Sequence, residues 1–241
     1  MRLTRANNKA IEYACKHFHY AKAVPVNTVG YNVYNAKDEW CGVVLYGSGA
    51  CNHIGCSYNL PQGAVVELVR VALNGKQECT SQAVAMSLKE LKKDCPLVRL
   101  VVSYADCDQS HLGTIYQETN WVYTGTNNVG DCGAFIIHGK KVHKKSIYSK
   151  IVIDENGHKI NCPQTLEAVR KYLDPNAEQF YTQGKRKYLM PLDKRMRKQI
   201  EPLRKPYPKT DENWHKIDRS IFKKNDEDKA QKLTNVAQPT D

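Results

Sequence analysis

The sequence predicts an α/β fold in which helices flank a mixed β-sheet. Short runs rich in β-branched and aromatic residues alternate with segments of helical periodicity. The middle of the chain has the order strand, loop, helix, strand, helix, which typically gives parallel strands because these need a long crossover connection. With 241 residues, of which 41% are hydrophobic, the chain can form one sizeable domain with an appendage, or two small domains.

Apolar spacing defines the elements of the first hundred residues. They are a helix at 5–18, strands at 28–36, 40–49 and 64–73, and a helix at 81–94. The polar turn KDE joins the first two strands as a hairpin. The third strand leads through the loop NGKQECTS into the second helix, for which Thr80 or Ser81 is the expected N-cap.

The chain changes character after residue 140. Before that point we expect a strand at 97–105, a short helix at 113–120, and strands at 121–127 and 133–139. Beyond it, basic segments surround a small hairpin at Asn156-Gly157 and a helix at 163–173. The last part has many charges and little periodicity, which is typical of a disordered tail. We therefore expect a core at 1–140, a basic extension at 141–204 and a charged tail at 205–241.

The net charge of +11 is concentrated in the second part of the chain. Residues 1–135 contain 12 Lys/Arg against 11 Asp/Glu, whereas residues 136–241 contain 24 against 14. This asymmetry indicates a nearly neutral half that holds the chemistry and a basic half that meets a polyanion. A basic tail that serves only solubility is the alternative.

The nine cysteines do not form an evident disulfide or zinc pattern. No N-terminal segment resembles a signal peptide and no run of about 18 apolar residues is present, so we expect reduced thiols in a cytoplasmic protein without membrane contact. The segment CNHIGC places Cys51, His53 and Cys56 close together, with Cys41 as a further thiol. Zinc sites usually have a second closely spaced pair of ligands, which is missing here, so zinc is not favoured.

A polar block follows the most strand-like stretch of the chain. The segment SYADCDQSHLGTIYQETNWVYTG covers residues 103–125 and comes directly after LVRLVV. In open α/β sheets, ligands bind at the carboxyl ends of strands. Asp106, His111 and Tyr116 are therefore candidates for a functional site, and an ordinary polar turn before a helix is the alternative interpretation.

Four segments of the chain together resemble the Mom family of phage DNA-modification proteins. They are HYAKAVP, ELVRVAL, SYAD…HLGTIYQETNWVYTG and KYLMPLDKRMRK, and the match spans most of residues 10–200. The order of elements is similar to that of the acetyltransferase-like (GNAT) fold. The resemblance implies a GNAT-like enzyme, active in the host cytoplasm, that converts adenine in DNA to N6-carbamoylmethyladenine and so protects phage DNA from restriction.

The resemblance also implies an iron site formed by His19, Tyr20, Asp106 and Tyr116. Imidazole, phenolate and carboxylate suit iron, and phenolate favours Fe(III). The residues by themselves allow other roles. Asp106 can act as the base for the amine proton and Tyr116 as a donor to a leaving group. His19 can also be a cation at a helix C-terminus, and Tyr116 a core residue.

The donor site is expected between the strand at 64–73 and the helix that follows it. GNAT enzymes bind the pyrophosphate of acyl-CoA there with a glycine-rich loop. This loop departs from that pattern, since Gly75 is its only glycine, and the expected anion contacts are Arg70 and Ser81. Arg70 can instead pair with Glu67. The donor is therefore either acyl-CoA or a glycine-derived donor such as an aminoacyl-tRNA.

The basic half supplies candidates for binding double-stranded DNA. Lys and Arg neutralise phosphates without reading sequence and make binding depend on salt. No helix-turn-helix or zinc-finger pattern is present. The candidate contacts are Lys140, Lys141, Lys144, Lys145, Lys185, Arg186, Lys187, Arg195, Arg197 and Lys198.

Two other classes of function fit part of the sequence. A GNAT-type N-acetyltransferase acting on a protein or small-molecule amine would use the core but would not need the basic half. A non-catalytic DNA-binding protein would use the basic half but would not need the polar residues after residue 102. The sequence does not indicate an oligomeric state.

Overall fold

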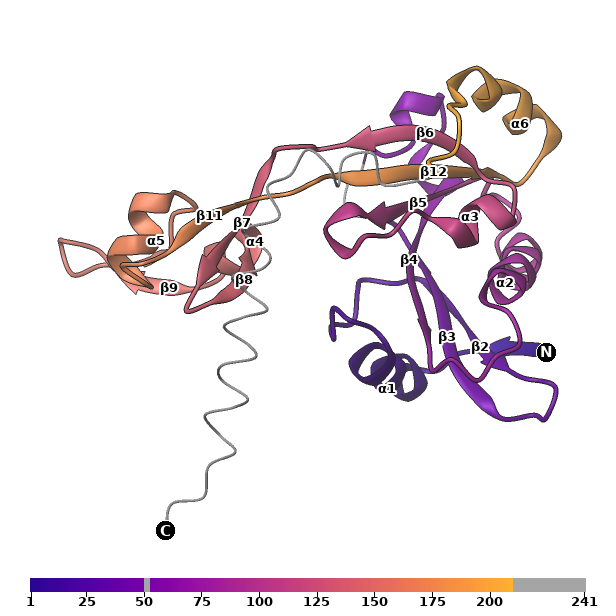
Figure 1. Ribbon diagram of the computed structural model, residues 1–241, viewed down its shortest axis with the longest axis horizontal. Helices are drawn as coiled ribbons and strands as arrows, with labels where there is room; N and C mark the ends of the chain where they lie inside the picture. Colours follow the sequence, from indigo (N-terminus) through magenta and orange to yellow (C-terminus); the bar gives the residue numbers. More distant parts are fainter. Residues whose placement is uncertain (50–52, 210–241) are drawn as a thin grey trace, which may run out of the picture. The chain divides into compact units, whose positions relative to one another are not determined.

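The computed structural model describes residues 1–49 and 53–209, and within them a seven-stranded mixed sheet forms the centre (Figure 1). Its strands are β1 (Arg2–Arg5), β2 (Val29–Tyr34), β3 (Trp40–Gly47), β4 (Val65–Leu73), β5 (Leu100–Asp106), β6 (Val122–Asn127) and β12 (Lys185–Pro191). Their order is β1-β2-β3-β4-β5-β12-β6, and β4 and β5 are parallel while the other neighbours are antiparallel. The mixed α/β class with a parallel pair around the crossover helix is confirmed.

Helices cover both faces of this sheet. On one face lie α2 (Thr80–Asp94) and α3 (Thr114–Glu118), and on the other lie α1 (Asn8–Phe18) and α6 (Lys194–Ile200). The alternation along β3 shows why, since Val44 and Tyr46 pack toward α2 while Val43 and Leu45 pack toward α1. A strand that is apolar on both faces, as β3 is, must be covered on both sides.

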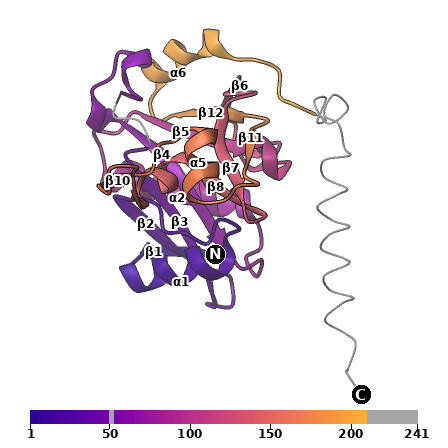
Figure 2. The same cartoon turned by 90° about the vertical axis from the view of Figure 1, so that its left-hand side faces the viewer.

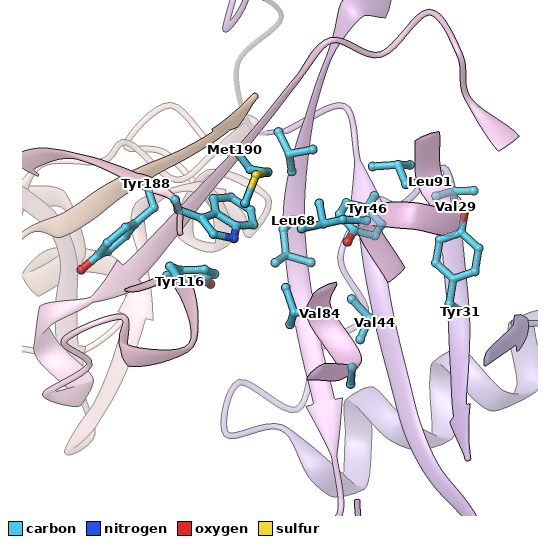
Figure 3. Packing of buried hydrophobic residues seen from close by; sticks show 14 of the residues in the cluster. Val29, Tyr31, Val44, Tyr46, Leu68, Val84, Leu91, Tyr116, Tyr188 and Met190 are labelled. Carbon is cyan, nitrogen blue, oxygen red and sulfur yellow. The ribbon is translucent and has the colours of Figure 1, made fainter. Parts of the chain in front are cut away.

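The core beneath α2 is closely packed (Figure 3). Val84 and Leu91 of α2 meet Val44, Tyr46 and Leu68 of the sheet. Leu91 is fully buried, so truncating it to alanine would cost about 2–5 kcal/mol. The Tyr46 hydroxyl lies 2.6 Å from the Ser87 hydroxyl, which gives this polar atom a partner inside the core.

The parallel strands β4 and β5 separate after their first three residues. Their pairing runs from Val65–Leu100 to Glu67–Val102 and stops, although both strands continue. Ser103 spans the start of the gap, because its hydroxyl donates to the Leu68 carbonyl at 3.0 Å. Beyond this point β4 and β5 no longer pair with each other, so the backbone groups on their facing edges have no neighbouring strand. This gap is therefore the natural place for a ligand.

A β-bulge in β4 determines where Arg70 points. The pairing with β3 shifts from Tyr46–Leu68 to Leu45–Arg70, so Val69 is an extra residue on β4. An extra residue reverses the alternation of side chains. Leu68 therefore packs beneath α2, whereas Arg70 turns to the face covered by α1.

A smaller sheet is built from the segment between β6 and β12. It contains β7 (Cys132–Ile137), β8 (Lys140–His143) and β11 (Glu178–Tyr181), with α4 (Lys144–Tyr148), β9 (Ile151–Ile153), β10 (Lys159–Asn161) and α5 (Leu166–Tyr172) between β8 and β11. Val169 of α5 and Phe135 of β7 belong to a separate apolar cluster. Figure 2 shows α5 together with β7, β8 and β11. Thr182 pairs with the segment between β6 and β7, so the two chain segments that connect the sheets form one ribbon. The Thr182 carbonyl accepts from Gly130 N, and the Thr182 N–H donates to the Asp131 carbonyl.

The expected domain division differs from the arrangement of the strands. Residues Met1–Tyr207 form one compact unit, and β12 of the expected basic extension lies between β5 and β6 in the main sheet. The sequence pattern does not indicate this strand, because its segment KRKYLMP begins with three charged residues. The four residues that follow them are all buried. The small hairpin at Asn156-Gly157 is confirmed as β9 and β10. The expected tail at 205–241 lies almost entirely outside the described residues.

Two helix starts also differ from expectation. The N-cap of α2 is Cys79, neither Thr80 nor Ser81, because Cys79 has extended backbone and Thr80 is already helical. The first helix begins at Asn8 instead of residue 5, because Asn7 caps it by accepting from Ala10 N at 2.9 Å. The residues before that cap form β1. No helix in residues 1–49 or 53–209 is long and apolar enough to cross a lipid bilayer.

Candidate functional site

The end of α1 places His19 and Tyr20 in one cluster with the end of β5. The helix stops at Phe18, because His19 adopts extended backbone and its Nδ1 accepts from Ala21 N at 3.1 Å. The rings of His19 and Tyr20 lie 4.2 Å apart at 32°. Adjacent residues at a helix end are thus able to stack on one another, which the sequence alone did not predict.

Electrostatic interactions show that further predicted residues surround this pair. Burial, together with the charges of Arg70 and His111, lowers the pKa of His19 to about 4. Burial, with the negative charge of Asp106, raises the pKa of Tyr20. The ring of His111 meets that of Tyr20 edge-on at 5.8 Å. We call this group the polar cluster, and it consists of His19, Tyr20, Arg70, Asp106 and His111. It combines residues from the end of α1, from β4, and from the end of β5 with the loop that follows.

Tyr116 reaches the gap between β4 and β5 from the opposite face of the sheet. It is buried against the rings of Trp121 and Tyr188, each 5.0 Å away. Its hydroxyl lies 2.8 Å from the Ser103 hydroxyl and is hydrogen-bonded to it. Burial raises the pKa of Tyr116 to about 12. Tyr116 is therefore both a core residue and the floor of the gap.

Ser103 is a site residue that sequence reasoning missed. The sequence predicts that Ser103 lies inside the strand at 97–105 and indicates no role for it. The signal is the alternation along β5, which puts Ser103 on the same buried face as Val101 and Ala105. A hydroxyl in such a position must find hydrogen-bond partners inside the protein.

The loop that carries His111 is held by two residues of β12. Arg186 donates from Nη1 to the His111 carbonyl at 2.9 Å, and the Tyr188 hydroxyl donates to the Leu112 carbonyl at 2.5 Å. Both side chains are almost fully buried. The next residue, Gly113, has φ +78 and lies against the Tyr188 ring. Strand β12 thus fixes the backbone of the loop, a function that no local pattern revealed.

The structure does not bring the two expected donor contacts together. Arg70 lies on the α1 face, its Nε is buried without a partner among the described residues, and its Nη2 is 3.5 Å from the Ala23 carbonyl. Ser81 is in the first turn of α2, which covers the opposite face, and its hydroxyl lies 2.9 Å from Cys79 Sγ. Gly75 in the loop before α2 has φ +84, which favours glycine. Acyl-CoA and a glycine-derived donor both remain predictions.

Several of the expected DNA contacts gather around His143. Burial and the charges of Lys145, Lys185 and Lys141 lower the pKa of His143. Lys185 begins β12 directly opposite Asp106 of β5. This lysine cluster, formed by Lys141, Lys145 and Lys185, therefore extends to the edge of the polar cluster.

The other expected DNA contacts fall into two groups. Lys140, Arg195 and Lys198 are exposed, and Lys144, Lys187 and Arg197 are partly buried. Arg186 differs, because it is 4% exposed and holds the His111 loop, so the structure removes it from the basic surface. Lys141 also has a structural bond, since it pairs with the buried carboxylate of Asp108 at 2.7 Å.

The four residues implied as iron ligands do not present a ready ligand set. The lone pair of His19 Nδ1 is occupied by the Ala21 N–H, so the neutral ring carries its proton on Nε2. The Tyr116 hydroxyl is hydrogen-bonded to Ser103. No group of three or more His, Cys, Asp or Glu within residues 1–49 and 53–209 is arranged to bind a metal. These donors fit iron poorly as they stand.

The segment considered for zinc gives no further support. His53 and Cys56 are exposed, Cys41 is buried in β3, and Cys51 lies outside the described residues.

The arrangement fits acid–base chemistry on an amine. Asp106 Oδ1 accepts from Asp108 N at 3.0 Å, which orients the carboxylate at the end of β5. Neutral His19 and the neutral phenol of Tyr20 lie beside it. A carboxylate at the mouth of the gap can take a proton from a substrate amine, and the lysine cluster can hold the substrate's phosphates.

A mixed sheet with a parallel pair that separates, and polar groups gathered at the gap, defines a mixed α/β protein with a candidate site at the gap. Two of the solved structures that it resembles are acetyltransferases. One from Bacillus subtilis in complex with CoA has 13% identity and a TM-score of 0.42, covering 80% of this chain and 99% of its own. A spermidine/spermine N-acetyltransferase from Vibrio cholerae in complex with manganese ions has 8% identity and a TM-score of 0.40, covering 83% and 95%.

The chain belongs to the Mom protein family, whose family model matches residues 1–209. No sequence match was found among curated proteins. The family match includes α1, the polar block after β5 and β12, so all residues of the polar cluster and the lysine cluster lie inside it.

Proposed function

We propose that this protein is a transferase that converts adenine in phage DNA to N6-carbamoylmethyladenine and thereby protects that DNA from host restriction. Membership of the Mom family supports the substrate and product. The observation that carries the proposal is the pairing of Lys185 with Asp106 across β12 and β5. This neighbourhood of a lysine and a carboxylate supports a site in which Lys185 holds a phosphate and Asp106 acts on an amine.

The chemistry of adenine explains why both surfaces are needed. The exocyclic amine is a weak nucleophile, because its lone pair is delocalised into the ring. It is also paired inside the duplex, so the base must leave the stack before it can react. The lysine cluster holds the backbone beside the extruded nucleotide, and Asp106 accepts the amine proton as the new N–C bond forms.

The reaction replaces one N6–H bond by an N6–CH2 bond. The amine gives a proton to Asp106, and the carbon of the donor accepts the nitrogen lone pair as its leaving group departs with the bonding pair. The proton then passes from Asp106 to the leaving group, so the carboxylate is regenerated. This step needs a donor that carries its leaving group on the methylene carbon and already contains the amide. Acyl-CoA and a glycine-derived donor such as an aminoacyl-tRNA are the proposed sources of that donor, because direct attack on the carbonyl of either would release CoA or tRNA and leave an N6-acyl product instead. None of these steps passes through iron.

Mass spectrometry of nucleosides tests the proposal directly. The full chain is expressed in a bacterial host, the cellular DNA is digested, and the adenosine fraction is weighed, with the Asp106→Asn variant as the control. A carbamoylmethyl-sized addition with the wild-type chain alone supports the proposal. An acetyl-sized addition would indicate an N-acetyltransferase acting on DNA, and unmodified adenosine despite soluble folded protein contradicts the proposal.

The same variant separates the two roles suggested for Asp106. Asp106→Asn keeps the shape of the side chain but removes its charge, so we expect a loss of about 10²-fold or more in modification rate. Iron is measured in the purified wild type and variant by elemental analysis. Equal iron in both, with activity lost, supports the base. Iron present in the wild type and lost in the variant supports ligation.

A further inference from the structure

We propose that Tyr20 is the stacking platform for the extruded adenine, with the ring of His111 as a side wall and Asp106 facing the exocyclic amine. This inference rests on the proposed function and deepens it. It gives Tyr20 a role through its ring face, whereas the family resemblance implies a role through its phenol oxygen.

The ring of Tyr20 is supported on one side and open on the other. His19 lies against it at 4.2 Å and 32°, which is close to a stacked arrangement. Tyr20 is nevertheless 51% exposed. His19 covers one face of the ring, and we therefore assign the exposed part of the side chain to the opposite face. His19 itself is anchored through Nδ1 to the backbone of Ala21, so the platform has a fixed base.

His111 makes this open face into a corner. Its ring meets that of Tyr20 at 5.8 Å and 74°, so it stands nearly perpendicular to the platform. The loop that carries His111 is fixed by Arg186 through the His111 carbonyl. We place the planar ligand on the face of Tyr20 that His19 does not cover, with the His111 ring at one edge of it.

The charges around the corner select the ligand. Asp106 is close enough to Tyr20 for its negative charge to influence the phenol, and a carboxylate accepts hydrogen bonds from an exocyclic amine. Lys185, opposite Asp106 on β12, supplies the positive charge for the adjoining phosphate. A nucleobase with an amine edge and a phosphate behind it satisfies all three groups.

An exposed tyrosine is not by itself a binding site, and the chain offers a matched comparison. Tyr13 of α1 is also 51% exposed and also lies against a histidine, His17, at 4.3 Å and 32°. It has Phe18 and Trp40 as its other ring contacts. Only the Tyr20 pair is joined by His111 and Asp106, so the two tyrosines separate the effect of exposure from the effect of the corner.

A binding experiment without any donor tests this role. The probe is a DNA duplex with one unpaired adenine, compared with the same duplex carrying an abasic site at that position. Dissociation constants of the full chain are measured by fluorescence anisotropy at one fixed salt concentration. Stacking of one base on one aromatic ring makes the wild type bind the adenine duplex at least about 5-fold more tightly.

Three variants give the expected pattern. Tyr20→Phe keeps the adenine-to-abasic ratio because the ring remains, whereas Tyr20→Leu reduces it to about one. Tyr13→Leu keeps the ratio, and thermal melting checks that each variant is folded. If Tyr20→Leu does not fold, Tyr20→Trp replaces it, and a larger ring should keep or raise the ratio.

Several results would overturn the inference. They are a wild-type ratio near one, an unchanged ratio in Tyr20→Leu, or a reduced ratio in Tyr20→Trp. A loss in Tyr20→Phe as large as in Tyr20→Leu would also overturn it, because the role would then belong to the phenol oxygen. The outcome is independent of the nucleoside assay, because no group is transferred. A protein that stacks adenine but leaves DNA unmodified contradicts the proposed function and not the platform.

Discussion

Replacing Gly113 by alanine should destabilise the protein more than the same change at another glycine with similar backbone geometry. Gly113 has φ +78, which costs a residue with a Cβ about 1–2 kcal/mol. An added Cβ would also lie 2.5 Å from Cε2 of Tyr188, well inside the contact distance. The Tyr188 ring cannot move away easily, because it is fully buried against Tyr116 and Tyr123. Overpacking of this kind adds about 1–3 kcal/mol.

Gly139 provides the control for the backbone contribution. Its φ is +71, and nothing lies within 4 Å of its virtual Cβ. We expect Gly139→Ala to lower the free energy of unfolding by about 1–2 kcal/mol, and Gly113→Ala by about 2–5 kcal/mol. Urea unfolding followed by circular dichroism gives both values, provided that the slope of the transition is unchanged. Equal destabilisation by the two variants would refute the packing of the His111 loop on Tyr188.

Two further predictions concern named side chains. Asp193→Ala should lower the free energy of unfolding by about 1–2 kcal/mol at pH 7, because it removes the N-cap of α6 and a partly exposed ion pair with Arg99. The Arg99 guanidinium lowers the pKa of Asp193 from 3.8 to about 2. The stability that the ionised Asp193 carboxylate contributes is therefore complete above pH 3.8 and disappears as the pH falls toward 2. Urea titrations of both proteins across this range check it, and a constant difference would contradict it. Arg186→Met should reduce DNA modification without changing the salt dependence of DNA binding, whereas Lys185→Met should reduce that slope by about one. A slope reduced by one in Arg186→Met would mean that this arginine contacts phosphate after all.

Local periodicity was sufficient to predict most of the regular structure. Short apolar runs rich in β-branched and aromatic residues identified β2, β3, β4 and β5, and the 3.6-residue repeat identified α1 and α2. The parallel pairing of β4 with β5 followed from the helix between them. Such patterns are readable because each depends on residues only a few positions apart. The position of Asp106 at the end of a strand was predictable for the same reason.

The sequence did not reveal β12, because its pairing is not local. Its residues 185–191 pair with residues 100–106, which lie 79 to 91 positions earlier in the chain. Nothing near residue 186 indicates that an arginine among lysines will be buried and will hold the His111 carbonyl. The clustering of basic residues predicted that Arg186 lies on a DNA-binding surface. The sequence shows the charge of a side chain, but it does not show which face of a sheet that side chain occupies.

The sequence alone therefore determined the order of the elements, the concentration of positive charge in the second half, and the polar residues after β5. The tertiary structure decided which of those residues meet. It brought His19 and Tyr20 from α1 to His111 and Asp106, and turned Arg70 toward them through a bulge. The physical reason is that strand register and bulges depend on packing across the whole sheet, and a shift of one residue moves a side chain to the opposite face.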